Sequence, residues 1–157
     1  MPSLDPEAPA DEPLAVYACS LLSRLSEAFQ VPRRTVEANY WTPTPNDCHD
    51  NAEKWVQLNQ GWSVVHGWLV FDLRVSHGYV DLLPHSIVRS PSGELVDVTP
   101  LAPQAPKAVG VFPFLSHLGA AKEFQHLVAN YSVAQLRVRV RPTTVSFFTE
   151  IRDPSLS

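Results

Sequence analysis

The stretch 85–99, with the sequence HSIVRSPSGELVDVT, predicts a β-hairpin. Two short strands are expected, over 85–89 and 94–99, and the turn sequence SPSG at 90–93 lies between them. Proline at the second position of a type I turn, with glycine where a left-handed residue follows, is typical of a three-residue hairpin loop with a bulge. The turn chemistry therefore predicts the register of the hairpin as well as its existence.

This register places a histidine and a carboxylate on the same face of the hairpin. The loop pairs Ser90 with Glu94, so that Ile87 faces Asp97. Residues two apart in a strand share a face, which makes His85 and Asp97 diagonal neighbours, roughly 7–8 Å apart at the backbone. A two-residue loop would shift the register by one and separate them onto opposite faces. We therefore expect His85 to be a base and Asp97 the carboxylate that orients it.

A cysteine is predicted in the first turn of a helix upstream of this hairpin. Asn46 or Asp47 caps a helix that runs to about Asn59, and Cys48 follows the cap directly. Backbone N–H groups at a helix start lack intrahelical acceptors, so they favour a thiolate and can bind an oxyanion. A buried core cysteine is the alternative, because Cys48 is in phase with the apolar face of the helix.

The remaining pattern predicts an α+β domain with helices packed against an antiparallel β-sheet. We expect helices over 13–29 and 116–130, strands over 62–75 and 134–141, a connection over 76–84 and a proline-rich loop over 100–113. Residues 1–12 have the composition of a disordered acidic tail, and 13–157 are expected to form one domain. Gly67, in the central strand, predicts a close approach of another backbone or of a ligand.

Composition excludes several classes of protein. The chain has 157 residues, 45% of them hydrophobic and 18% charged, which is compatible with a packed core and argues against wholesale disorder. Four acidic residues in the first twelve account for the net charge of −4, so the neutral remainder argues against nucleic-acid binding. No apolar run is long enough for a membrane helix, the N-terminus does not resemble a signal peptide, and two cysteines build no disulfide framework. A cytoplasmic protein is expected.

The order Asn46-Asp47-Cys48-His49, then His85-Ser86-Ile87-Val88, then Asp97-Val98-Thr99-Pro100 resembles the papain-like and transglutaminase-like cysteine superfamily. The resemblance covers about residues 46–100. It implies a small papain-like fold in which Cys48 is the nucleophile, His85 the base and Asp97 the orienting residue. It also implies a hydrolase or acyltransferase that cleaves an amide or peptide bond through a thioester and needs no metal or other cofactor. A peptidase, an amidase, a deamidase and a transglutaminase-like transferase all fit, with a protein, a peptide or a small amide as substrate.

The chain departs from the papain pattern around the cysteine. Thr42 occupies the place of the oxyanion-hole glutamine, and His49 replaces the aromatic residue that often follows the nucleophile. Asn46 is therefore the nearest side-chain candidate for an oxyanion donor, although it also suits a helix cap. Trp62 and Trp68 suit the core, although one of them could line a cleft beside the cysteine, and Trp68 is the second candidate for contact with the substrate. His66 is the second choice of base, although a hydrogen-bonded core histidine is its ordinary role.

Two other functions remain open from the sequence. A zinc site could use dispersed ligands from Cys48, His49, His66, His77, His85 and Asp97, although no paired ligand motif is present. A non-catalytic binding module could use the alternating arginines 137, 139 and 141, which otherwise form a solvated strand face.

Overall fold

The computed structural model describes residues 12–103, 112–130, 133–140 and 145–151. The helical elements are α1 (Glu12–Ser23), the 3-10 turn η1 (Leu25–Glu27), α2 (Cys48–Leu58), α3 (Arg74–His77) and α4 (Ala121–Asn130). The strands are β1 (Ser63–Leu73), β2 (Tyr79–Arg89), β3 (Leu95–Val96), β4 (Phe114–Ser116), β5 (Val133–Val140) and β6 (Val145–Ile151). Helices packed against an antiparallel sheet confirm the predicted α+β class. The tail predicted over residues 1–12 lies outside the described residues, apart from Glu12.

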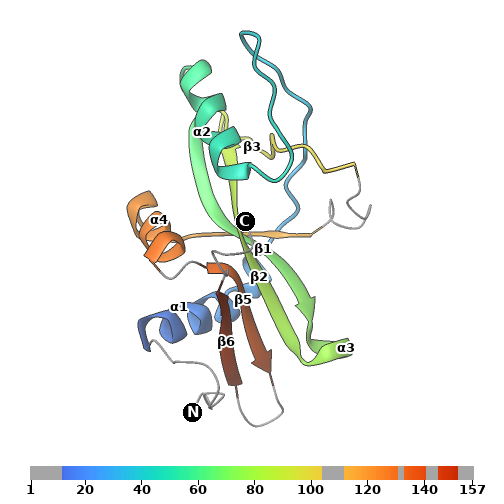
Figure 1. Cartoon of the computed structure of the whole chain (residues 1–157), viewed down its shortest axis with the longest axis vertical. Helices are drawn as coiled ribbons and strands as arrows, with labels where there is room; N and C mark the ends of the chain where they lie inside the picture. The colour runs from blue at the N-terminus through green and yellow to red at the C-terminus, as the bar shows by residue number, and fades with distance from the viewer. Residues whose placement is uncertain (1–11, 104–111, 131–132, 141–144, 152–157) are drawn as a thin grey trace.

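The sheet is built around one long hairpin. Strands β1 and β2 have 11 residues each and pair along their whole length, from Ser63 opposite Arg89 to Leu73 opposite Tyr79. The strand order is β4-β1-β2-β5-β6, with β3 paired to β2. The β1–β2 hairpin runs through the molecule, with α2 near one end and α3 at its turn (Figure 1). The predicted central strand over 62–75 is confirmed as β1.

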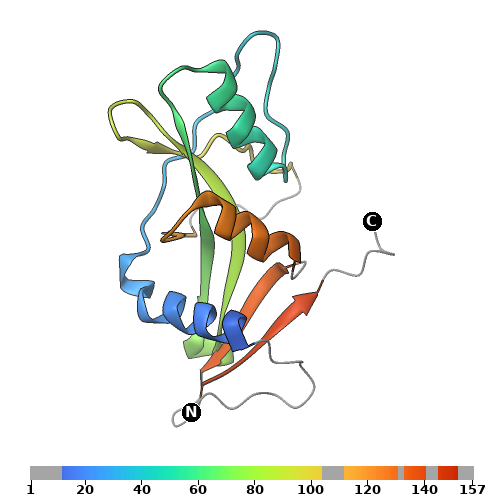
Figure 2. The same cartoon turned by 90° about the vertical axis from the view of Figure 1, so that its left-hand side faces the viewer.

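Three helices cover one side of this hairpin. Figure 2 shows α1, α4 and α2 following one another along the same side of β1 and β2. Side chains of β1, β2, β4 and β5 pack with those of α1 and α4 in one cluster. The main core contains the following buried residues: Leu14, Ala15, Ala18, Leu21, Trp68, Val70, Val80, Leu82, Leu115, Phe124, Leu136 and Val138. A smaller cluster under α2 contains Ala52, Val88, Val96 and Val98. Burial of these apolar surfaces is what fixes each helix on the sheet.

The predicted hairpin register is confirmed. Val88 pairs with Val96, and Arg89 pairs with Leu95. The turn is closed by the Ser90 N–H, which donates to the Glu94 carbonyl at 2.8 Å. Strand β3 is shorter than the predicted 94–99, because Asp97 forms a parallel bridge with Arg33 instead of continuing the ladder with β2.

Strand β2 begins earlier than the sequence predicts. The connection expected over 76–84 is wrong: α3 and Gly78 form a short turn, and Tyr79 already belongs to β2. Tyr79 and the three residues after it pair with β5 as well as with β1, and this long-range pairing has no local sequence signal. Pro84 lies two residues beyond the last β2–β5 pair, where a proline removes no hydrogen bond to β5.

Other boundaries also differ from the prediction. Helix α1 ends at Ser23 and is followed by η1, and α4 begins at Ala121 because residues 114–116 pair with β1 as strand β4. The strand predicted over 134–141 is confirmed as β5, whereas β6 had no prediction. The predicted loop over 100–113 is described only in part. No helix within the described ranges is long and apolar enough to cross a membrane.

The predicted close approach at Gly67 is confirmed. A Cβ at this position would lie 2.3 Å from the Leu115 carbonyl oxygen and 2.5 Å from the Phe114 ring. Gly67 is also the β1 partner of His85, and the Phe114 ring makes an edge contact with the His85 imidazole at 6.4 Å between centroids. Because Gly67 has no side chain, the Phe114 ring can lie against β1 and contact the imidazole of His85.

Gly67→Ala should destabilise the fold by about 3 kcal/mol, because both colliding groups are buried and belong to the sheet. Chemical denaturation of the purified protein measures this loss. Gly93→Ala is the control: its Cβ would meet nothing within 4 Å, and only the left-handed backbone would be strained. A Gly67→Ala variant no less stable than Gly93→Ala would contradict the packing described here.

Candidate active site

A side-chain clamp fixes the start of α2 and with it Cys48. Asp47 is the N-cap residue but makes no side-chain cap, because its carboxylate accepts a hydrogen bond from the Thr44 hydroxyl at 2.9 Å. Asn51 is buried, donates to the Thr44 carbonyl at 2.7 Å and accepts from the Thr44 N–H at 3.1 Å. The same Asn51 amide donates to the Thr99 hydroxyl at 3.1 Å. These bonds tie the first turn of α2 to Thr44 and to Thr99, in the chain after β3.

The start of α2 meets β2 where the sheet edge is open. On the edge of β2 away from β1, β5 pairs with residues 79–82 and β3 with residues 88–89. No strand in the described ranges pairs with residues 83–87 along this edge, and α2 packs against β2. Since His85 lies in the middle of this interval, the helix start can come close to its imidazole.

His85 and Asp97 form the pair that the register predicted. His85 Nε2 lies 2.7 Å from Asp97 Oδ2, and both side chains are buried. With Nε2 engaged by the carboxylate, Nδ1 is the ring nitrogen left for the thiol of Cys48. The interaction of Cys48 with His85 completes a Cys–His–Asp arrangement assembled from α2, β2 and the chain after β3.

The backbone of Asp97 is held by a segment far away in the sequence. The Asp97 N–H donates to the Pro32 carbonyl at 2.9 Å, and the Arg34 N–H donates to the Asp97 carbonyl at 3.0 Å. The carboxylate accepts the Thr99 N–H at 3.0 Å on Oδ1 and Arg33 Nη2 at 3.2 Å on Oδ2. Arg33 therefore shares one carboxylate oxygen with His85, which the sequence did not predict.

The electrostatics favour a thiolate–imidazolium pair. Burial alone would raise the pKa of Cys48, but hydrogen bonding to His49 and His85 and the charges of both rings lower it to about 6. Burial would lower the pKa of His85, but hydrogen bonds to Asp97 and Cys48 and the negative charge of both raise it to about 9. Burial also opposes ionisation of Asp97, yet His85, the Thr99 N–H and Arg33 hold its pKa below the usual value.

A second histidine network lies on the other side of Cys48. His49 Nδ1 is 2.5 Å from the Ser86 hydroxyl, and His66 Nδ1 is 2.7 Å from the same oxygen. His66 also stacks on Phe124 at 4.9 Å between centroids and is buried. The sequence pointed to His66 only as a second base. The signal that could have revealed the network is the cross-strand pairing of His66 with Ser86.

Cys48 and His85 open onto a cavity of about 330 Å³. Its apolar lining comprises Leu69, Phe71, Leu83, Pro84, Pro100, Leu101 and Ala102. The polar lining adds Arg33, Asn46 and Thr99. This arrangement can place an acyl group beside the sulfur, because an apolar pocket with few polar groups orients a bound molecule.

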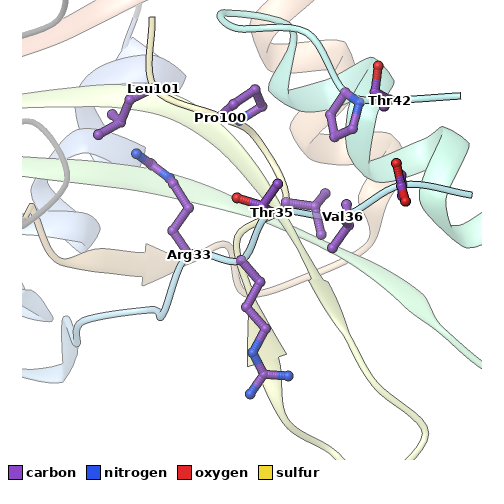
Figure 3. A pocket seen from close by; sticks show the side chains of 10 residues that line it. Arg33, Thr35, Val36, Thr42, Pro100 and Leu101 are labelled. Carbon is purple, nitrogen blue, oxygen red and sulfur yellow. The ribbon is translucent and has the colours of Figure 1, made fainter. Parts of the chain in front are cut away.

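A larger cavity, of about 510 Å³, lies next to this one and shares Arg33, Pro100 and Leu101 with it. Figure 3 shows its lining, with Arg33 and Leu101 on one side and Val36 and Thr42 on the other. Its lining includes neither Cys48 nor His85, so the smaller cavity is the one that carries the candidate chemistry.

The two weaker site predictions have different outcomes. Asn46 lines the cavity beside Cys48 and has a left-handed backbone (φ +65°), which asparagine tolerates better than most residues. Trp68 is fully buried, donates from Nε1 to the Tyr17 hydroxyl and does not line the cavity. The structure therefore places Trp68 in the main core, away from the lining of the cavity at Cys48.

The metal site and the arginine face, the two alternatives left open by the sequence, have different outcomes. Within the described ranges, no three histidine, cysteine or acidic side chains are arranged to hold a metal ion, and His77 is exposed beside Ser76. The expected solvated arginine face is wrong at Arg137, which is half-buried and pairs with Asp81 at 2.7 Å. Arginine 141 lies outside the described residues.

Comparison with protein-family models, curated proteins and solved structures finds no match to this chain.

Alkylation by iodoacetamide should select Cys48 over Cys19 at neutral pH, because only Cys48 lies at a helix start between two histidines. The thiolate is the reactive form, so the rate should fall about tenfold per pH unit below a midpoint near 6. Mass spectrometry of the labelled peptides follows both sites at once. Equal rates at the two cysteines in the folded protein would contradict the electrostatics described here.

Proposed function

We propose that this protein is a cysteine-nucleophile hydrolase or acyltransferase that acts on an amide or peptide bond through a thioester. The observation that carries the proposal is the buried His85–Asp97 hydrogen bond beside Cys48 at the mouth of an apolar cavity. This arrangement supports the proposal, because covalent acyl transfer needs a nucleophile, a base and a group that orients the base close together. The remote resemblance of residues 46–100 to papain-like and transglutaminase-like proteins agrees with this chemistry.

The proposed reaction begins from the thiolate of Cys48 and the imidazolium of His85. The sulfur attacks the carbonyl carbon of the substrate, and the tetrahedral oxyanion collapses with cleavage of the C–N bond. His85 gives its proton to the departing amine, which leaves Cys48 acylated. Water or an acceptor amine then loses a proton to His85 and attacks the thioester, which frees the sulfur. With water the product is a carboxylic acid, and with an amine it is a new amide.

Stabilisation of the oxyanion is assigned to the start of α2. The Cys48 N–H lies in the first turn of the helix, where N–H groups have no intrahelical acceptor. The Asn46 side chain lines the same cavity and supplies a second donor. The apolar side chains from β1 and β2 favour an apolar group next to the reacting carbonyl.

An activated ester tests the proposal without knowledge of the natural substrate. Incubation with p-nitrophenyl acetate should acetylate Cys48, because the ester needs only the thiolate and an oxyanion site. Mass spectrometry after acid quenching locates the acetyl group, and release of p-nitrophenol measures the rate. Cys19→Ser should behave like the wild-type protein, and Cys48→Ser should lose the reaction. Acetylation of Cys19 to the same extent, or none at Cys48, would contradict the proposal.

Asp97→Asn should slow turnover of the ester on the order of 10³-fold. The asparagine oxygen can still accept the Thr99 N–H, but its NH₂ group would face the Nε2–H of His85 and oppose the imidazolium. Asp81→Asn is the matched control, because Asp81 is also buried and ion-paired with an arginine.

The control should lose stability, measured by thermal unfolding, but keep the reaction. The proposed role of Asp97 fails if both variants keep wild-type turnover, or if both lose it in proportion to their stability.

A further inference from the structure

The contacts of Cys48 extend beyond His85 to a buried chain of polar side chains. Cys48 interacts with His49, His49 Nδ1 contacts the Ser86 hydroxyl at 2.5 Å, and that hydroxyl contacts His66 Nδ1 at 2.7 Å. Ser86 is fully buried, and His66 is buried as well. Buried polar groups that are fully hydrogen-bonded to one another hold a unique arrangement, whereas a broken chain leaves a costly unpaired group.

The Ser86 hydroxyl restricts the protonation of both rings. A hydroxyl has one hydrogen and two lone pairs, so Ser86 can donate to only one of the two Nδ1 atoms and must accept from at least one of them. When His49 is protonated, its Nδ1–H donates to Ser86, and the Ser86 hydrogen is available to His66. The two rings therefore cannot both carry their only proton on Nε2.

We propose that His49 is a second acceptor of the Cys48 proton, independent of His85, and that Ser86 and His66 are positioning residues that fix its ring. In this step the S–H bond of Cys48 breaks and an N–H bond forms on His49, which leaves a thiolate and an imidazolium. The inference deepens the proposed function, because it names a further group that prepares the nucleophile. It is tested on the thiol itself, so its failure can be told apart from failure of the acyl chemistry.

The charged groups around His49 are consistent with this role. On its own helix it adjoins Cys48, and from β2 the other histidine near the sulfur is His85. From β1 it faces His66, whose pKa is lowered by burial and then by the charges of His49 and His117. The contact from α4 is the uncharged ring of Phe124, at 6.0 Å between centroids. His66 is thus held neutral and can accept the Ser86 hydrogen whenever His49 carries a charge.

The test is the pH dependence of Cys48 alkylation in matched pairs of variants. His49→Gln should raise the midpoint by about one pH unit, and Ser86→Ala should raise it by less, because the ring stays but loses its orientation. His77→Gln and Ser76→Ala are the controls, since His77 Nδ1 contacts the Ser76 hydroxyl at 2.7 Å on the exposed α3. Both controls should leave the curve unchanged.

Removal of His85 separates the two acceptors. In His85→Gln the midpoint should stay below that of the double variant His49→Gln/His85→Gln, because His49 still takes the proton. The proposal is overturned if His49→Gln matches His77→Gln, or if the single and double His85 variants coincide. Failure of the acetylation assay with a shifted alkylation midpoint would refute the acyl chemistry but leave this inference in place.

The wild-type protein provides a measurement that needs no substitution. Ring-nitrogen shifts in isotope-labelled protein should show a proton on Nδ1 of at least one of His49 and His66, because Ser86 can donate to only one of them. The Ser86→Ala spectrum is the comparison, since neither Nδ1 then contacts a hydroxyl. Two rings that both carry their only proton on Nε2 in the wild-type protein would overturn the proposal even if His49→Gln failed to fold.

Discussion

The hydrogen bond between His85 Nε2 and Asp97 Oδ2, 2.7 Å long, depends on three separate parts of the fold. His85 depends on the β1–β2 ladder and on the Phe114 ring that Gly67 admits. Asp97 depends on the hairpin turn for its face and on backbone bonds to residues 32–34 for its position. The bond therefore requires correct strand register, a correct turn and a correctly placed N-terminal segment. A shift of one residue in the hairpin would turn Asp97 to the opposite face and break it.

The charges of the Cys48–His85–Asp97–Arg33 series cancel, which reduces the free-energy cost of burying them. Along this series of contacts the groups alternate in sign: the thiolate of Cys48, the imidazolium of His85, the carboxylate of Asp97 and the guanidinium of Arg33. Each buried charge has an opposite neighbour, which offsets the cost of removing it from water. Arg33 has a further effect, because it donates a hydrogen bond to the same Asp97 oxygen that contacts His85. This shared oxygen weakens the electrostatic interaction between the carboxylate and the imidazolium.

The sequence was most informative where structure is determined by neighbours along the chain. The turn residues 90–93 predict the register, and the helix-start position of Cys48 follows from the polar residues before an apolar stripe; both are confirmed. The approach of a backbone at Gly67 was also predicted, though not that it is β4. What was missed depends on distant pairing: the early start of β2, strand β4, the Pro32–Arg34 contact with Asp97 and the Ser86 bridge. No periodicity in 79–84 reveals that β5 pairs there, and only the sheet register shows that His66 lies opposite Ser86.

The position of α2 at the open edge of β2 explains why Cys48 is contacted from two sides. Successive side chains of a strand point to opposite faces, so His85 and Ser86 lie on opposite faces of β2. A helix packed squarely over one face would reach only one of them. Within the described part of the chain, β5 and β3 leave residues 83–87 without a partner on the edge of β2 away from β1. The first turn of α2 therefore straddles this edge: Cys48 contacts His85, and the next residue, His49, contacts Ser86. The gap in strand pairing therefore creates two separate histidine environments at one sulfur, and this gap exists because the chain leaves β3 at Asp97 to pair with residues 32–34.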